Sequence, residues 1–185
     1  DRGDARPTLV VAVAAATPWP DTTSIATVPW TRNERSAVAG VKTTSYAENV
    51  IALAYAKERG AVEAIFANTR GELCEATGSN VFVVLDGVVS TPPLDSGCLA
   101  GITRELVLEW CREDGLEVIE EALPLDVLTR ADEVFLTSSI KDVFPVSSVD
   151  DRAFAAPGPV TARARDVWAR PAAARVDPSP TRVGG

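Results

Sequence analysis

The sequence predicts one mixed α/β (or α+β) domain, and three observations support this fold class. Strand patterns outnumber helix patterns, and β-hairpins alternate with helical crossovers. Neither an internal repeat nor a second domain boundary is visible in the 185 residues. A hydrophobic content of 46% and a charged content of 24% are ordinary for a globular chain of this length.

The first two predicted strands are Thr8–Val13 and Ser24–Val28. The first is almost continuously apolar, which is typical of a strand that is covered on both faces. The second should end at Pro29, because proline cannot donate a ladder hydrogen bond.

The first predicted helix begins near Ser45 and ends at Gly60. The run from Ser45 to Glu48 has the spacing of a capping box, in which the serine hydroxyl binds first-turn amides and the glutamate reaches back. The side chains that share one helical face, and that we therefore expect to be buried, are Tyr46, Val50, Leu53 and Ala54.

Strands and turns dominate the middle of the chain. Ala64–Phe66 is a predicted strand, and Asn68–Gly71 is a predicted turn. Val81–Leu85 and Val88-Val89 flank Asp86-Gly87, a pair that favours the tight turn of a β-hairpin.

A second helix should begin at Gly101 and end before Gly115, with a buried stripe of Leu106, Val107, Trp110 and Cys111. Strands are predicted at Leu116–Ile119 and Glu133–Thr137, with a short helix at Pro124 between them.

A final amphipathic helix is predicted over residues 160–169, burying Val160, Ala164, Val167 and Trp168. The Ala, Pro, Arg and Gly composition of residues 171–185 predicts a disordered tail. We therefore expect residues 1–170 to form the folded domain.

Composition excludes several classes of partner. The net charge of −8 argues against nucleic acid or an anionic membrane, and no apolar run has the length of a bilayer span. The three cysteines lack metal-ligand spacing and the chain has no histidine, so we expect no metal site and a reducing, cytoplasmic setting. The chain starts at Asp1 and contains no methionine, so we expect a fragment or a processed product.

The absence of histidine moves proton transfer and covalent chemistry onto lysine, carboxylates, tyrosine or a cofactor. Lys42 lies where a strand hands over to a helix, which suits an amine that forms an imine with an aldehyde cofactor. Further on, Glu75 precedes a run of small residues and could pair with the ring nitrogen of such a cofactor. Taken singly, each residue is more typical of a solvated surface side chain, and the functional interpretation depends on the segments that accompany it.

Two further segments could bind anions. The small-residue loop ending in Gly101-Ile102-Thr103 presents free amides and the positive end of a helix dipole, which is the construction of a phosphate site. Thr137-Ser138-Ser139-Ile140 places hydroxyl groups at a strand end. An ordinary helix start and an ordinary turn are the alternatives. Dinucleotide-binding and NTP-binding glycine motifs are absent from the sequence, as are the histidine-based triads and zinc sites.

These four segments, in this order, resemble the class IV aminotransferases, and the resemblance runs from about Thr8 to Trp168. This group contains branched-chain and D-amino acid aminotransferases and 4-amino-4-deoxychorismate lyase, which use pyridoxal 5′-phosphate (PLP) on fold type IV. The resemblance implies that the chain is the large C-terminal domain of such an enzyme, without the smaller N-terminal domain. It also implies a homodimer that acts on a small amino substrate.

The resemblance further implies a role for each matching residue. Lys42 would hold the cofactor as an internal aldimine and then move the substrate Cα proton, and Glu75 would pair with the pyridine nitrogen. Asn80 would hold the local geometry near Glu75. The residues implied in phosphate binding are Gly101, Ile102, Thr103 and Ser139, and those near a substrate carboxylate are Ser138 and Ile140.

The reaction has several candidates at this stage. The stretch around Trp30 and Lys42 is closest to actinobacterial 4-amino-4-deoxychorismate lyase-like sequences, which favours release of pyruvate and 4-aminobenzoate. Amino-acid transamination would use the same residues, and an inactive or non-catalytic fragment is the next alternative. A degenerate binding module would be expected to lose Lys42 or Glu75. A Schiff-base aldolase would not need the phosphate cradle at Gly101.

Overall fold

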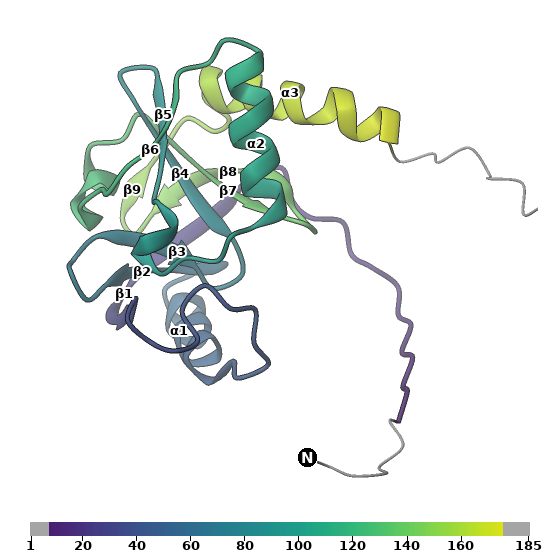
Figure 1. Ribbon diagram of the computed structural model, residues 1–185, viewed down its shortest axis with the longest axis vertical. Helices are drawn as coiled ribbons and strands as arrows, with labels where there is room; N and C mark the ends of the chain where they lie inside the picture. Colours follow the sequence, from purple (N-terminus) through teal and green to yellow (C-terminus); the bar gives the residue numbers. More distant parts are fainter. Residues whose placement is uncertain (1–7, 176–185) are drawn as a thin grey trace, which may run out of the picture.

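The computed structural model describes residues 8–175, which form a curved mixed sheet with helices on its outer face (Figure 1). The helices are α1 Ala47–Glu58, α2 Ile102–Glu113 and α3 Pro159–Arg175, with the short 3-10 turns η1 Leu94–Ser96 and η2 Leu125–Thr129. The strands are β1 Thr23–Arg32, β2 Glu63–Asn68, β3 Leu73–Ala76, β4 Asn80–Leu85, β5 Val88–Thr91, β6 Val118–Glu120, β7 Glu133–Ser138, β8 Asp142–Val149 and β9 Arg152–Ala153.

The sheet mixes parallel and antiparallel pairs in the order β3-β2-β1-β8-β7-β4-β5-β6, with β9 beside β8. Strands β1 and β2 are parallel and are joined through α1, whereas β4 and β5 form the predicted hairpin. The hairpin turn is Asp86-Gly87, with φ angles of 52° and 82°. The predicted fold class is confirmed by this mixture of crossovers and hairpins.

Alternation along the central strands divides the interior into two layers. Val81 and Val83 of β4 face one apolar cluster, which η2 closes with Val127 and Leu128. Phe82 lies on the opposite face of the sheet, stacked on Phe135 of β7 at 4.8 Å between ring centroids. Successive side chains of a strand point to opposite faces, so one short run supplies both layers.

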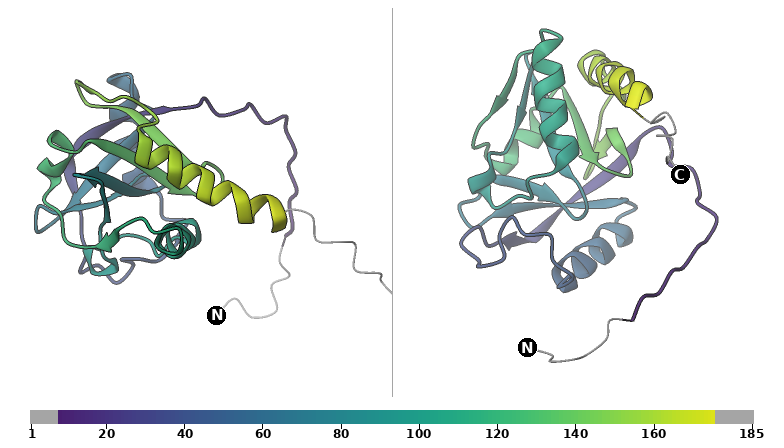
Figure 2. Two further views of the ribbon diagram at one scale, coloured as in Figure 1. Left: turned by 90° about the horizontal axis from the view of Figure 1, so that it is seen from above. Right: turned by 45° about the vertical axis from the view of Figure 1, so that its right-hand side comes forward.

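The outer face of the sheet has two separate helical covers. Helix α1 packs on β1 and β2, while α2 and α3 pack on the strands at the other end (Figure 2, right). The stripes predicted for α2 and α3 face the core, and their members at most 8% exposed are Val107, Trp110, Cys111, Ala164 and Val167. Leu106, Val160 and Trp168, which were also predicted to be buried, are only partly buried. Helix α3 continues to Arg175, so the predicted tail is helical at its start, and its remainder lies outside the described residues.

Predictions for three segments were wrong. Thr8–Val13 forms no strand: the segment before β1 extends away from the body (Figure 1), and Leu9, Val10, Val11 and Val13 are at least 78% exposed. An apolar run forms a strand only when a neighbouring strand pairs with its backbone N–H and C=O groups. Within residues 8–175, no strand pairs with this run.

The capping box at Ser45 is also absent. Tyr46 is the N-cap residue and no side chain bonds the first-turn amides of α1, while the Glu48 carboxylate turns to Arg32 at 3.3 Å. The buried residues of α1 are Ala52 and Ala56, whereas Val50 is 61% exposed, so the predicted buried face was wrong. Small alanines let the helix lie close to the alanines of β1 and β2.

The third error concerns β1, which continues through Pro29 to Arg32. Its pairing with β2 shifts register between Thr27 and Thr31, and this irregularity accommodates a residue that cannot donate a hydrogen bond. The extension matters for the site, because it carries Arg32 to the cavity described next.

Candidate functional site

A cavity of about 740 Å³ lies between the two helical covers, and all nine predicted site residues line it. They come from four separate parts of the chain: the β1–α1 loop, the β3–β4 region, the start of α2 and the β7–β8 turn. The residues brought together are Lys42, Glu75, Asn80, Gly101, Ile102, Thr103, Ser138, Ser139 and Ile140. Segments almost one hundred residues apart in sequence therefore converge on one space.

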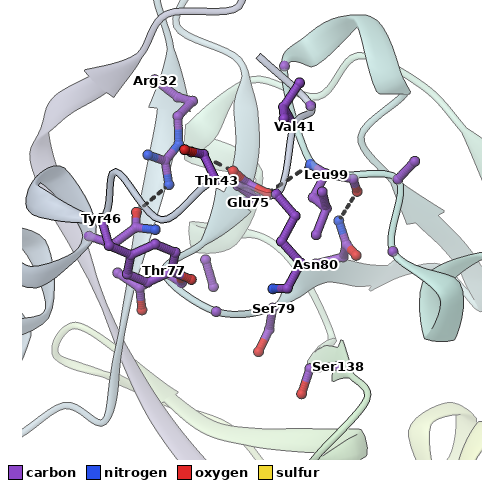
Figure 3. Close-up of a pocket in the computed structure, with 18 of the residues that line it drawn as sticks. Arg32, Val41, Thr43, Tyr46, Glu75, Thr77, Ser79, Asn80, Leu99 and Ser138 are labelled. Carbon is purple, nitrogen blue, oxygen red and sulfur yellow. Dashed lines mark hydrogen bonds and ion pairs between the residues drawn. The ribbon is translucent and has the colours of Figure 1, made fainter. Parts of the chain in front are cut away.

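Glu75 of β3 has both carboxylate oxygens engaged. Its Oε2 accepts the Leu99 backbone N–H at 2.9 Å, and its Oε1 forms an ion pair with Arg32 Nε at 3.2 Å (Figure 3). Burial raises the pKa of Glu75, and the Leu99 N–H and the charges of Arg32 and Lys42 offset part of that rise. The carboxylate is thus fixed in position. Its present partners offset only part of the cost of burying its negative charge, so it suits a cationic partner inside the cavity.

Arg32 is a site residue that the sequence reasoning missed. Its guanidinium lies 4.2 Å from the centroid of the Phe66 ring, donates to the Asn49 side chain at 2.6 Å and pairs with Glu75. The only available signal was its place in the run Trp30–Arg35, and that run was predicted to lie beyond the end of the strand. Tyr46 was also missed as a cavity residue, and its phenol donates to the Thr77 carbonyl at 2.9 Å.

Leu99 is held through both of its backbone polar groups. Its N–H donates to the Glu75 carboxylate, and its carbonyl accepts a hydrogen bond from the Asn80 side-chain amide at 2.7 Å (Figure 3). Gly101 then passes so close to Asn80 that a Cβ atom at position 101 would lie 2.1 Å from Asn80 Oδ1. Asn80 was predicted to hold the local geometry near Glu75. Its hydrogen bond is made to the loop of Leu99.

Helix α2 begins at the cavity with an open N-terminus. Gly101 is the N-cap residue, and no side chain bonds the first-turn amides of the helix. These amides and the helix dipole attract an anion. The side chain of Thr103 is buried at the cavity wall, whereas that of Ile102 is 71% exposed.

The end of strand β7 supplies unpaired hydroxyl groups. Thr137 Oγ1 and Ser138 Oγ are buried and have no hydrogen-bond partner among residues 8–175, and both residues line the cavity. Buried polar atoms without a partner are costly, so such a pair indicates atoms that a ligand satisfies. Together with the open start of α2, this arrangement fits a ligand that carries an anionic group.

Lys42 belongs to the loop between β1 and α1, not to a strand end as expected. The residue is exposed and lines the cavity, and its charge offsets part of the rise that burial causes in the pKa of Glu75. The loop is anchored at its base by Glu34, whose carboxylate accepts the Thr69 N–H at 3.0 Å and the Thr69 hydroxyl at 2.7 Å. These hydrogen bonds lower the pKa of Glu34.

The three cysteines are free and buried, and burial raises the pKa of each thiol. Among residues 8–175, no three His, Cys, Asp or Glu side chains gather as metal ligands would. No helix within the same residues has the length and apolar content needed to cross a bilayer.

The family model of amino-transferase class IV matches residues 1–149. The D-alanine aminotransferase of Bacillus licheniformis is 42% identical over 123 residues, which cover 65% of this chain and 43% of that protein.

Among solved structures, the branched-chain amino acid aminotransferase of Thermobaculum terrenum in its PLP form is 36% identical, with a TM-score of 0.76 over 80% of this chain and 50% of that one. A Legionella pneumophila protein assigned as a 4-amino-4-deoxychorismate lyase is 28% identical, with a TM-score of 0.79 over 82% and 57% of the two chains. The chain therefore spans between 43% and 57% of the length of each of these proteins.

Proposed function

This chain belongs to the amino-transferase class IV family, and we propose that its cavity binds PLP and serves chemistry at the amino group of a small substrate. The observation that carries the proposal is the convergence of an amine, a largely buried carboxylate and an open helix N-terminus on one cavity. When bound, PLP supplies an electron-withdrawing ring that stabilises charge on the substrate carbon next to the amino group.

In this proposal the Lys42 amine would hold the cofactor through its aldehyde group. As a free amine, the same group would hold and move the proton of the substrate Cα atom. The chain contains no histidine that could take this role. The hydrogen bonds between Glu34 and Thr69 fix the start of the loop that carries this amine.

Glu75 would face the ring nitrogen and keep it protonated. The Leu99 N–H and Arg32 hold its two oxygens, so the carboxylate cannot rotate away from a ligand. A buried carboxylate in surroundings of low polarity favours a cationic partner, and a protonated ring nitrogen is such a partner.

The cofactor phosphate would lie against the first-turn amides of Ile102 and Thr103, with help from Ser139, while Gly101 permits the close approach to Asn80. The substrate carboxylate would lie near Ser138 and Ile140. The unpaired hydroxyl groups of Thr137 and Ser138 support an anion on this side.

The anchor is tested by trapping. Adding PLP, reducing with borohydride and mapping the modified peptide should place the cofactor on Lys42. Lys42→Ala should abolish the trapped product, whereas Lys57→Ala, which changes an exposed lysine of α1, should not. Modification of another lysine at equal yield would show that the anchor is misassigned.

Two reactions are candidates for the complete protein. Amino transfer is supported by the similarity to D-alanine and branched-chain aminotransferases. The lyase reaction expected from the sequence is supported by the similarity to the Legionella protein. Measuring keto-acid-dependent amino transfer against release of 4-aminobenzoate and pyruvate separates them, since each product set excludes the other.

A protein that binds PLP without turnover is the third candidate, and it would show trapping but neither reaction. The homodimer and the cytoplasmic location remain predictions. Size measurement in solution, with and without PLP, tests the first of these.

A further inference from the structure

One buried ion pair lies behind the cavity wall and has no part in the proposed chemistry. Lys141 Nζ lies 2.5 Å from Glu63 Oε1, and the two side chains are 8% and 5% exposed. Glu63 begins β2, within the sheet, whereas Lys141 lies in the turn between β7 and β8. Neither residue lines the cavity, although Ser138, Ser139 and Ile140 immediately before Lys141 do.

The same Glu63 oxygen also binds the opposite turn. Ser79 Oγ donates to Glu63 Oε1 at 3.1 Å, and Ser79 lies in the β3–β4 turn that lines the cavity. Both Ser79 and Ser138 lie along the lower wall of the cavity in Figure 3. One carboxylate oxygen thus joins two turns that lie about sixty residues apart in sequence.

Lys141 is enclosed by aromatic rings as well. Its ammonium lies 4.8 Å from the Trp19 ring centroid and 5.8 Å from that of Phe144. A lysine side chain is long and flexible, so its position is defined only where several partners hold the ammonium. Here a carboxylate and two rings hold it, and the turn that carries it is held in consequence.

We propose that Lys141 is a positioning residue: through Glu63 it fixes the β7–β8 turn against the β3–β4 turn and so sets where Ser138–Ile140 meet the anionic group of a ligand. This inference rests on the proposed function for the identity of the ligand. The shared ligand chemistry is an anion, which is either the cofactor phosphate or the substrate carboxylate.

The first test measures, without any ligand, whether the Lys141–Glu63 ion pair holds the two turns together. In Lys141→Met, amide hydrogen exchange should become faster in both turns, at residues 77–80 and 138–142, and stay unchanged in the β4–β5 hairpin. Lys57→Met is the matched control, because it removes an exposed lysine away from the cavity. Unchanged exchange in the two turns would overturn the proposal, whatever the function of the site.

The second test asks whether the Lys141–Glu63 ion pair controls the recognition of an anion. Affinities for pyridoxine 5′-phosphate and pyridoxine, neither of which has an aldehyde, give the preference for phosphate. N-(5′-phosphopyridoxyl)-alanine and its carboxamide give the preference for carboxylate. Lys141→Met should lower one of these two preferences by about tenfold, because displacing a positioned donor by about 1 Å has effects of at least this size. The preference that falls identifies the anion.

A purely structural pair would behave differently. Glu63→Leu combined with Lys141→Met replaces the pair by apolar side chains, which often restores stability. We expect the double variant to regain thermal stability but to keep the lowered anion preference, and Lys141→Arg to recover that preference in part. Equal losses of affinity for both members of each ligand pair would overturn the proposal. Failure of the unsubstituted protein to bind any of the four ligands would refute the proposed function. The hydrogen-exchange measurement would still show whether the Lys141–Glu63 ion pair holds the two turns together.

Discussion

Replacing Gly101 with alanine would place a methyl group inside the Asn80 side chain. The added Cβ atom would lie 2.1 Å from Asn80 Oδ1 and 3.3 Å from its Cγ, and the next atom, Arg104 Cβ, is at 3.6 Å. The backbone angles of Gly101, φ −72° and ψ 134°, are open to alanine. Asn80 alone therefore opposes the substitution.

The magnitude follows from what Asn80 must give up. Its side chain is held to the Leu99 carbonyl at 2.7 Å, and the residue is 5% exposed. Moving it aside loses a hydrogen bond worth about 1 kcal/mol and leaves the buried Asn80 amide without this partner, at a cost of about 1–3 kcal/mol, whereas the Leu99 carbonyl keeps the Gly101 N–H. We expect Gly101→Ala to lower the free energy of unfolding by about 2–4 kcal/mol.

Asn80→Ala should reverse the sign of this effect. Without the Asn80 amide, the methyl group introduced by Gly101→Ala has room, and alanine restricts the unfolded chain, which stabilises by about 0.4–1 kcal/mol. The two substitutions should thus be coupled by about 3 kcal/mol. Urea unfolding of the two single variants and the double variant measures the coupling. Additive effects would refute the reasoning.

Gly78→Ala serves as the matched control in the same turn region. Its added Cβ atom would meet Glu63 Oε1 at 3.4 Å, which is an ordinary contact distance. We expect a change in the free energy of unfolding within about 1 kcal/mol. A loss as large as that of Gly101→Ala would mean that this turn tolerates no added atom, and that the Asn80 contact is not the cause.

Two further predictions concern carboxylates outside the cavity. Because its hydrogen bonds lower the pKa of folded Glu34, the ionised group stabilises the fold above the ordinary glutamate pKa, and this contribution is lost as pH falls through the lowered pKa. Glu34→Gln should therefore weaken the acid dependence of the free energy of unfolding between about pH 5 and pH 2, and an unchanged slope would contradict this. Glu133 of β7 accepts the N–H groups of Val160 and Thr161 at 2.9 and 2.7 Å, so Glu133→Gln should destabilise the start of α3 by about 1–2 kcal/mol in thermal unfolding. The exposed Glu117→Gln is its control, and equal effects would refute the role.

Local patterns identified much of the fold. The Asp86-Gly87 hairpin and the stripes of α2 and α3 follow from turn chemistry and helical periodicity, which act over a few residues. Strand β8 escaped prediction because Pro145 lies within it, and β3 because Leu73–Ala76 is short and contains Glu75. Each pairs with the strand that directly precedes it, β3 with β2 and β8 with β7, and β8 pairs in addition with the distant β1.

The segments of the site were recognisable for a different reason. Lys42, Glu75, Gly101-Ile102-Thr103 and Ser138-Ser139 each carry a residue type suited to one part of a cofactor, and their order matched a family. Arg32 and Lys141 carried no such pattern. Their importance comes from partners at a distance: Glu75 for one and Glu63 for the other.

The sequence by itself determined the kinds of group available: a lysine without any histidine, a carboxylate before small residues, and loops rich in free amides and hydroxyls. Only the tertiary structure decided that these groups share one cavity, which face of α1 is buried, and that Thr8–Val13 stays exposed. Chemical identity is a property of each residue. Burial, pairing and convergence depend on which distant segments pack together, and no local pattern contains that information.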